Sequence, residues 1–175
     1  MIEGYISKLW QAWSNFNRGI LLAAIRGGTR SDGFVVTSAY DNLGDLEIAF
    51  VASQLGHKNP IGTIRQLSTR KHEPTWAYFE VPNRVLTGIS SNIEADLLQS
   101  FSAQATLNDL RVCRNSSAHI TPESLADVRA AQVRYSFNKF RHPTDMSFWL
   151  DQVTADFLWK SWISEMRFIS NSIVE

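Results

Sequence analysis

The sequence Val112-Cys-Arg-Asn-Ser-Ser-Ala-His-Ile-Thr121 joins two segments in which apolar residues recur at helical spacing. It ends at Thr121-Pro122-Glu123, which supplies an N-cap and then a proline in the first turn of a new helix. A junction between two helices can expose polar groups without disturbing the core. The stretch therefore predicts an all-α fold that carries a polar site at this junction.

The same helical period extends over most of the chain. We expect a single-domain helical bundle of about five to seven helices, covering residues 1–175. The segments with this period are residues 2–26, 36–56, 91–105, 107–118, 121–136 and a final helix from 143 onward. Whether 91–118 forms one helix or two that break near Thr106 stays open. The β-prone residues 34–37 can open as a strand.

Residues 57–89 are the least regular part of the chain, because they hold three of its five prolines. A short helix is expected at 63–70, and 75–81 is expected to form a strand or an extended loop.

Composition limits the class of protein. The hydrophobic fraction of 44% is typical of a folded domain, and the formal net charge of zero argues against strong, indiscriminate binding to nucleic acid. Cys113 is the single cysteine, which excludes a disulfide framework or a multi-cysteine zinc site. A small apolar helix residue is the favoured role for Cys113, with a nucleophile as the alternative.

Nothing in the sequence predicts a membrane segment or an export signal. Residues 1–4 lack a basic n-region, and the longest apolar run, Ile20 to Ile25, is too short to span a bilayer. We expect a cytoplasmic protein with no membrane partner, and the single cysteine fits a reducing compartment.

Arg114 and His119 stand five positions apart at the junction. The arginine is a permanent cation whose planar fork matches two phosphate oxygens, and the histidine can take and give a proton near neutral pH. On an ideal helix they are about 140° apart, so a helix that ends near Ala118 would free His119 to turn back. Together they suffice for metal-free cleavage of RNA, with two protomers on a two-fold axis bringing two such pairs to one groove.

The pattern Arg-Asn-x-x-x-His between two helices resembles the R-x4-6-H signature of the HEPN superfamily. Members are all-helical domains, and many are metal-independent ribonucleases of toxin–antitoxin, CRISPR and phage-defence systems with an active site at a dimer interface. The resemblance implies Arg114 and His119 as catalytic residues, Asn115 as the polar residue beside the arginine, and a protein partner that inhibits or activates. Toxins of the superfamily that are silenced by nucleotidylation carry tyrosine two places after the histidine, where this chain has Thr121.

Two stretches without acidic residues are candidates for RNA binding. The preferred one, 128–144, lies close to the motif and contributes, with the outward-facing Arg111, the candidate RNA-binding residues Arg111, Arg129, Arg134, Lys139 and Arg141. The other, 48–72, precedes Trp76, Tyr78 and Phe79, an interleaving typical of single-stranded RNA binding. A basic, solvated loop beside core aromatics is the alternative interpretation.

The sequence is compatible with three functions. The first is an endoribonuclease, without metal or cofactor, that leaves 2′,3′-cyclic phosphate and 5′-hydroxyl ends. The second is a catalytically inactive HEPN-like module for binding or assembly in a larger complex, which the apolar final helix and the neutral charge favour. In a purely structural interpretation, Arg114 caps the last carbonyls of a helix, Asn and Ser satisfy backbone groups, and His119 is structural. The third, a metallohydrolase, is disfavoured because the four histidines show no helical ligand spacing.

Overall fold

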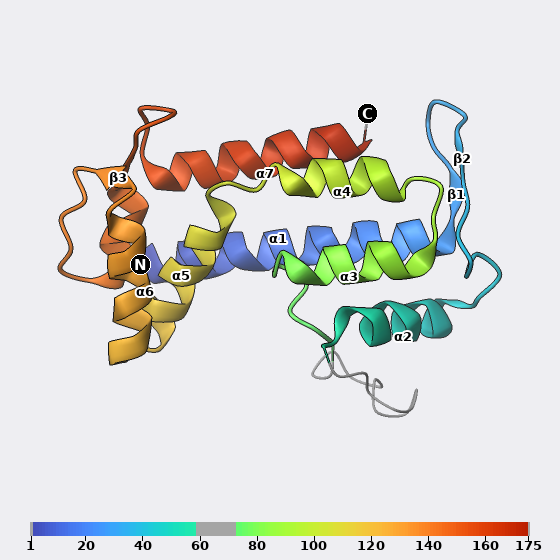
Figure 1. Cartoon of the computed structure of the whole chain (residues 1–175), viewed down its shortest axis with the longest axis horizontal. Coiled ribbons are helices and arrows are strands. Elements are labelled where there is room, and N and C mark those ends of the chain that lie inside the picture. The colour runs from blue at the N-terminus through green and yellow to red at the C-terminus, as the bar shows by residue number, and fades with distance from the viewer. Residues whose placement is uncertain (1, 59–72, 175) are drawn as a thin grey trace. The chain divides into compact units, whose positions relative to one another are not determined.

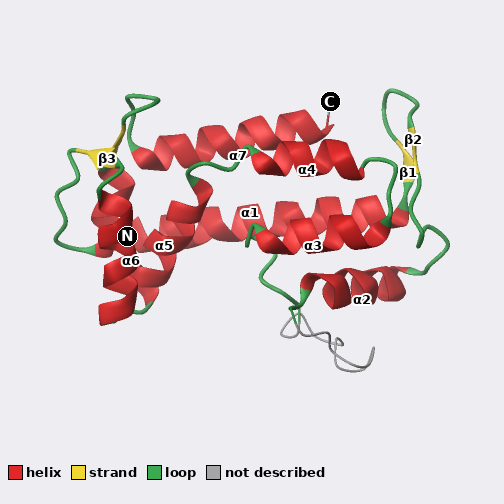
Figure 2. Cartoon of the chain, in the orientation of Figure 1, coloured by secondary structure: helices red, strands yellow, loops and turns green. Residues whose placement is uncertain are grey.

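The computed structural model describes residues 2–58 and 73–174, which are mostly helical (Figures 1 and 2). Helices come in the order α1 (Ile2–Arg26), α2 (Asp45–Gly56), α3 (Glu80–Ile89), α4 (Glu94–Ser102), α5 (Leu107–Ala118), α6 (Pro122–Gln132), the 3-10 helix η3 (Pro143–Phe148) and α7 (Leu158–Val174). The short strands are β1 (Gly28–Thr29), β2 (Val35–Val36), β3 (Tyr135–Ser136) and β4 (Leu150–Asp151), paired antiparallel as β1–β2 and β3–β4. The expected all-α character is confirmed.

The chain divides into two compact units. One consists of residues 1–12 and 103–175, and we call it the junction unit because it contains Val112–Thr121; the other consists of residues 13–102. The helix α1 contributes residues to both units.

The unit of residues 13–102 is organised by one apolar face of α1. Trp13, Leu21 and Ile25 are buried, and the Trp13 ring packs edge-on against Phe101 of α4, with ring centroids 6.3 Å apart. Apolar residues at this spacing form one face of a helix, which favours burial of that face. The amide of the buried Asn17 donates to the carbonyl of Trp76 (3.0 Å), so a polar residue on the same face also has a partner.

Several sequence predictions for these segments are resolved. Val35 and Val36 form β2, as the β-prone residues suggested, so the helix expected over 36–56 is wrong in its first part and α2 begins only at Asp45. The segment 91–118 is two helices, because α4 ends at Ser102 and α5 begins at Leu107. The strand or extended loop at 75–81 is wrong, because turns at Thr75–Tyr78 lead into α3, where Pro82 lies in the first turn and needs no hydrogen-bond donor. The short helix expected at 63–70 lies outside the described residues.

The final helix starts later than expected. Residues 143–148 form a 3-10 turn, β4 follows, and α7 begins only at Leu158. The Asp151 carboxylate accepts hydrogen bonds from the Val153 N–H (2.9 Å) and the Thr154 hydroxyl (3.1 Å). A side chain that binds the backbone two residues onward stabilises a turn in place of a helix.

Gly27, at the end of α1, has a φ of +70°, and a Cβ placed there would lie 2.7 Å from the Val36 carbonyl oxygen. We expect Gly27→Ala to lower the free energy of unfolding by about 1–3 kcal/mol, since it adds backbone strain and a close contact. Gly19, inside α1 with open space around it, is the matched control: Gly19→Ala should stabilise by about 0.5–1 kcal/mol. Urea denaturation of both variants measures whether the free energy of unfolding falls for Gly27→Ala and rises for Gly19→Ala.

In the junction unit, α5 packs against α6, η3 and α7. The buried apolar side chains of this unit include Leu107, Leu110, Met146, Trp149 and Trp162. The Glu165 carboxylate of α7 accepts hydrogen bonds from the backbone N–H groups of Ala105 and Thr106 and from the Thr106 hydroxyl. An acidic group there satisfies unpaired N–H groups and complements the helix dipole, which fixes the start of α5.

Candidate functional site

The helix α5 ends where the sequence predicts, and the residue after it is His119. His119 has φ −140° and ψ 89°, and its backbone N–H donates to the Asn115 carbonyl (2.9 Å). These angles are not helical, so the chain leaves the helix axis at the histidine and its side chain is exposed. Thr121 caps α6 and Pro122 is the first residue of that helix, as expected.

Serine side chains fasten the turn between α5 and α6. The Ser124 hydroxyl donates to the His119 carbonyl (2.8 Å), and the hydroxyl of the buried Ser116 donates to the Ser124 carbonyl (2.9 Å). The Thr121 side chain accepts from the Ser124 N–H (3.2 Å), which completes a capping box. The backbone on both sides of His119 is therefore fixed.

Arg114 lies in the last turn of α5 and is half-buried. Its Nη1 donates to the Oδ1 atom of the adjacent Asn115, 3.0 Å away. Within the described residues no hydrogen bond joins Arg114 to His119. The junction thus presents a guanidinium held by a neutral amide, and an exposed imidazole four residues beyond that amide. Such a pair can bind a phosphate and move a proton.

The candidate RNA-binding residues differ in what they contact. The Nε atom of Arg111 donates to Asn108 Oδ1 (3.0 Å), and Arg129 is exposed on α6. The Arg134 guanidinium lies 2.5 Å from the carboxylate of Asp109, which is only 2% exposed and which also accepts a hydrogen bond from the Tyr135 hydroxyl. One end of Arg134 is thus already committed to a buried partner.

The Asp109 contacts shift two acid–base equilibria. The hydrogen bond from Arg134 to Asp109 raises the pKa of the guanidinium above its ordinary value. Burial, followed by the hydrogen bond to Asp109, raises the pKa of Tyr135. Both shifts favour the observed pairing of a cation and a neutral phenol with one carboxylate.

Lys139 and Arg141 line a shallow cavity of about 330 Å³ together with aromatic residues. Phe137 on its rim is 84% exposed and has a φ of +48°, while the floor includes the buried Trp149. The Asp145 carboxylate in this cavity accepts the N–H groups of Arg141 (2.8 Å) and His142 (2.9 Å). We call this the Phe137 cavity. It combines an exposed ring with two cations, the groups that single-stranded nucleic acids use for stacking and phosphate contact.

The sequence analysis missed Phe137 and Phe148 as candidate binding residues. The available signal was the alternation in Phe137-Asn-Lys-Phe-Arg141, where aromatic and basic residues are interleaved within the preferred basic stretch. For the other basic stretch, Arg65, Arg70, Lys71 and His72 lie outside the described residues.

Cys113 is fully buried, and its thiol donates to the Pro143 carbonyl (3.4 Å). Burial raises the pKa of Cys113 to about 12. A neutral, buried thiol is a poor nucleophile, which favours the apolar helix role.

We expect native Cys113 not to react with a thiol reagent at pH 8, and to react once urea unfolds the chain. The unfolded thiol ionises near pH 9.0 and the folded one only near 12, so the folded state retains a proton that the unfolded state loses. The contribution of this pKa shift to the free energy of unfolding is fully present below pH 9 and is lost as the pH rises toward 12. Stoichiometric labelling, with and without urea, checks the first point; rapid labelling of the native protein would contradict it.

Residues 2–58 and 73–174 contain no group of three histidine, cysteine or acidic side chains placed to hold a metal ion. In the same ranges, no helix combines the length and apolarity needed to cross a membrane.

Comparison with known proteins gives no relative: no family model, curated protein or solved structure matches this chain.

Proposed function

We propose that this chain is a metal-independent endoribonuclease of the HEPN type that acts in the cytoplasm as a two-fold dimer. The observation that carries the proposal is the junction itself, where Asn115 holds the Arg114 guanidinium and the C-cap backbone turns His119 to solvent. The fastened turn supports it, because a catalytic pair must keep its geometry without the help of a bound metal.

The reaction needs only groups that the junction supplies. The 2′-oxygen of the RNA attacks the adjacent phosphorus while an imidazole removes its proton, and the bond to the 5′-oxygen breaks as that oxygen gains a proton. Arg114 donates hydrogen bonds to the non-bridging oxygens, whose charge grows in the transition state. One imidazole cannot stand on both sides of the phosphorus. Two protomers would provide His119 once as base and once as acid.

The experiment that tests this is incubation of the purified full chain with single-stranded RNA in EDTA, followed by analysis of the product ends. The expected products carry 2′,3′-cyclic phosphate and 5′-hydroxyl ends, at a rate that added Mg²⁺ does not raise. Cleavage that requires a divalent metal, or that leaves 5′-phosphate ends, contradicts the mechanism. Light scattering of the same sample measures whether the dimer forms.

The Phe137 cavity is the part of the surface that we expect to hold the strand. Replacing Lys139 and Arg141 together with alanine should weaken RNA binding and reduce the salt slope of log K by about 1.4, since each single-strand phosphate contact contributes about 0.7. Fluorescence anisotropy on a His119→Ala background measures binding without cleavage. Arg167→Ala, which removes an exposed guanidinium on α7, is the control and should leave the slope unchanged.

A second candidate function is a HEPN-like module for binding or assembly without catalysis. It is favoured by exposed apolar side chains in the junction unit, of which Val153 is 93% and Phe168 is 62% exposed. Exposed apolar groups of this size are typical of surfaces that meet another protein, such as an inhibitor or an activator. The two functions are distinguished by His119→Ala, which would leave the effect of a pure binding module intact.

A further inference from the structure

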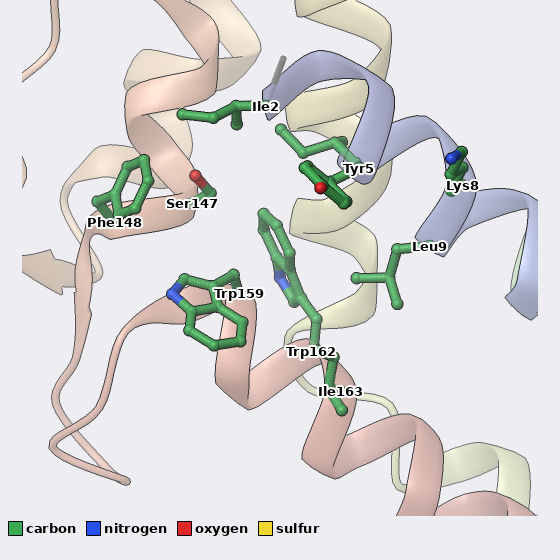
Figure 3. Close-up of a pocket in the computed structure, with 10 residues that line it drawn as sticks. Ile2, Tyr5, Lys8, Leu9, Ser147, Phe148, Trp159, Trp162 and Ile163 are labelled. Carbon is green, nitrogen blue, oxygen red and sulfur yellow. The ribbon is translucent and has the colours of Figure 1, made fainter.

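The junction unit contains a second, larger cavity, which shares Phe148 with the Phe137 cavity but includes neither Arg114 nor His119. It has a volume of about 510 Å³ and lies among the first turns of α1, the end of η3 and the start of α7 (Figure 3). Its walls include Tyr5 and Leu9 of α1, Phe148 of η3, and Trp159, Trp162 and Ile163 of α7. Small-molecule sites are concave and mostly apolar, with volumes of about 300–1,000 Å³, and this cavity meets each criterion.

The aromatic rings of this cavity are only partly covered by the protein. Tyr5 is 66%, Phe148 is 46% and Trp159 is 37% exposed, whereas Trp162 at the centre is fully buried. Figure 3 shows the Trp162 indole standing between Tyr5, Leu9 and Trp159. A flat or elongated apolar molecule placed here would cover the exposed rings, and each Å² of apolar surface removed from water gives about 25 cal/mol.

The cavity is lined by few polar groups, and the charged one among them is a cation. The Nε1–H of Trp162 is buried and has no hydrogen-bond partner within the described residues. The Ser147 hydroxyl already donates to the Thr144 carbonyl (2.7 Å), so its lone pairs are what remain for a weak contact. Lys8 is the single charged residue in the lining, and no acidic side chain lines the cavity. The charge at its edge is therefore positive.

We propose that this cavity binds a small amphipathic anion, with an aliphatic or aromatic body among the tryptophans and an acidic group at Lys8. A carboxylate paired with an ammonium forms a charge-assisted hydrogen bond, so Lys8 would favour an acidic head group. A cationic head would meet Lys8 with no acid to balance it. This binding is independent of RNA cleavage at the junction.

The experiment compares three ligands of one chain length with the full-length protein: decanoate, decanol and decylamine. Intrinsic fluorescence includes the emission of Trp159 and Trp162 among the six tryptophans of the chain, so its ligand-induced change is compared between wild type and Trp159→Phe. Displacement of anilinonaphthalene sulfonate gives the dissociation constants. Decanoate should bind most tightly and decylamine at least about 10-fold more weakly, an energy difference of about 1.4 kcal/mol. Lys8→Glu should reverse that order, and Arg167→Glu, which changes a charge of α7 outside the lining, should not.

Several results would overturn the proposal. Failure of decanoate to displace the dye or to change the fluorescence removes the site, and equal binding of the three ligands removes the anionic specificity. Self-association that lowers dye binding as protein concentration rises, and that Trp159→Glu abolishes, would show that a second copy occupies the cavity. Because these readouts are binding constants, they are distinct from the failure of RNA cleavage.

Discussion

Replacing His119 with alanine should slow RNA cleavage in EDTA by about 10²–10⁴-fold, the usual contribution of a positioned general acid or base. The His119 imidazole is exposed at the C-cap of α5, and the backbone carbonyl of His119 accepts a hydrogen bond from the Ser124 hydroxyl. Removing the side chain therefore removes proton transfer with little effect on the turn. The rate is measured on a labelled oligonucleotide under single-turnover conditions, after circular dichroism and light scattering have shown an unchanged fold and oligomeric state.

Variants of the neighbouring residues separate catalysis from structure. Arg114→Ala should cause a loss of about 10²–10³-fold, as expected for a donor that stabilises transition-state charge, and Arg114→Lys should restore only part of it, because a lysine lacks the planar fork. Asn115→Ala removes the hydrogen-bond partner of the Arg114 guanidinium and should reduce the cleavage rate less than Arg114→Ala does. Arg167→Ala is the control for loss of a guanidinium elsewhere.

Equal cleavage by wild type, His119→Ala and Arg114→Ala would assign the activity to a contaminant or to another site. Absence of cleavage by all three would shift support to the binding module.

Replacing Asp109 with alanine should lower the free energy of unfolding by about 2–4 kcal/mol, the largest stability effect that we expect in the junction unit. The carboxylate is buried and pairs with both Arg134 and the Tyr135 hydroxyl, which joins the first turn of α5 to the segment after α6. Its loss leaves a buried hydroxyl without an acceptor and removes a negative charge from the N-terminal end of α5. Chemical denaturation gives the difference.

The pairing predicts a particular pattern among variants. Tyr135→Phe and Asp109→Ala should be non-additive, since both remove the same hydrogen bond, and a double-mutant cycle measures that coupling. Asp127 on α6 is exposed, so Asp127→Ala should leave the unfolding midpoint unchanged. A midpoint for Asp109→Ala equal to that of Asp127→Ala would contradict the structural role assigned to the pair.

The helices that could be predicted are those whose capping residues and apolar period lie within the helix or next to it in the sequence. Thr121 and Pro122 specify the start of α6, and Trp13, Leu21 and Ile25 repeat at a helical period that the structure buries. Residues 149–157 could not be predicted in this way. There the backbone of Leu150 pairs with Ser136 and with Phe157, contacts between residues separated along the chain that no local period records.

In the candidate site, too, some positions follow from the local sequence and others depend on contacts between distant residues. The positions of Arg114, Asn115 and His119 at a helix end follow from sequence, because the cap and the proline mark the junction. The pairing of Arg134 with Asp109 could not be predicted from sequence, because Asp109 lies 25 residues earlier and its burial depends on packing. The left-handed backbone of Phe137 is also set by its surroundings, because a residue with a Cβ rarely adopts that conformation by itself.

The split of α1 between two units has a consequence for biosynthesis. Residues 1–12 belong with 103–175, so the unit that holds Arg114 and His119 is discontinuous, and its first segment leaves the ribosome about ninety residues before the next. At about 5–20 residues per second, that interval is roughly 5–18 s. Residues 13–102 can fold meanwhile, but the junction unit assembles only after α7 has been translated. Nascent chains would thus carry Arg114 and His119 in an incomplete unit until α7 has been translated.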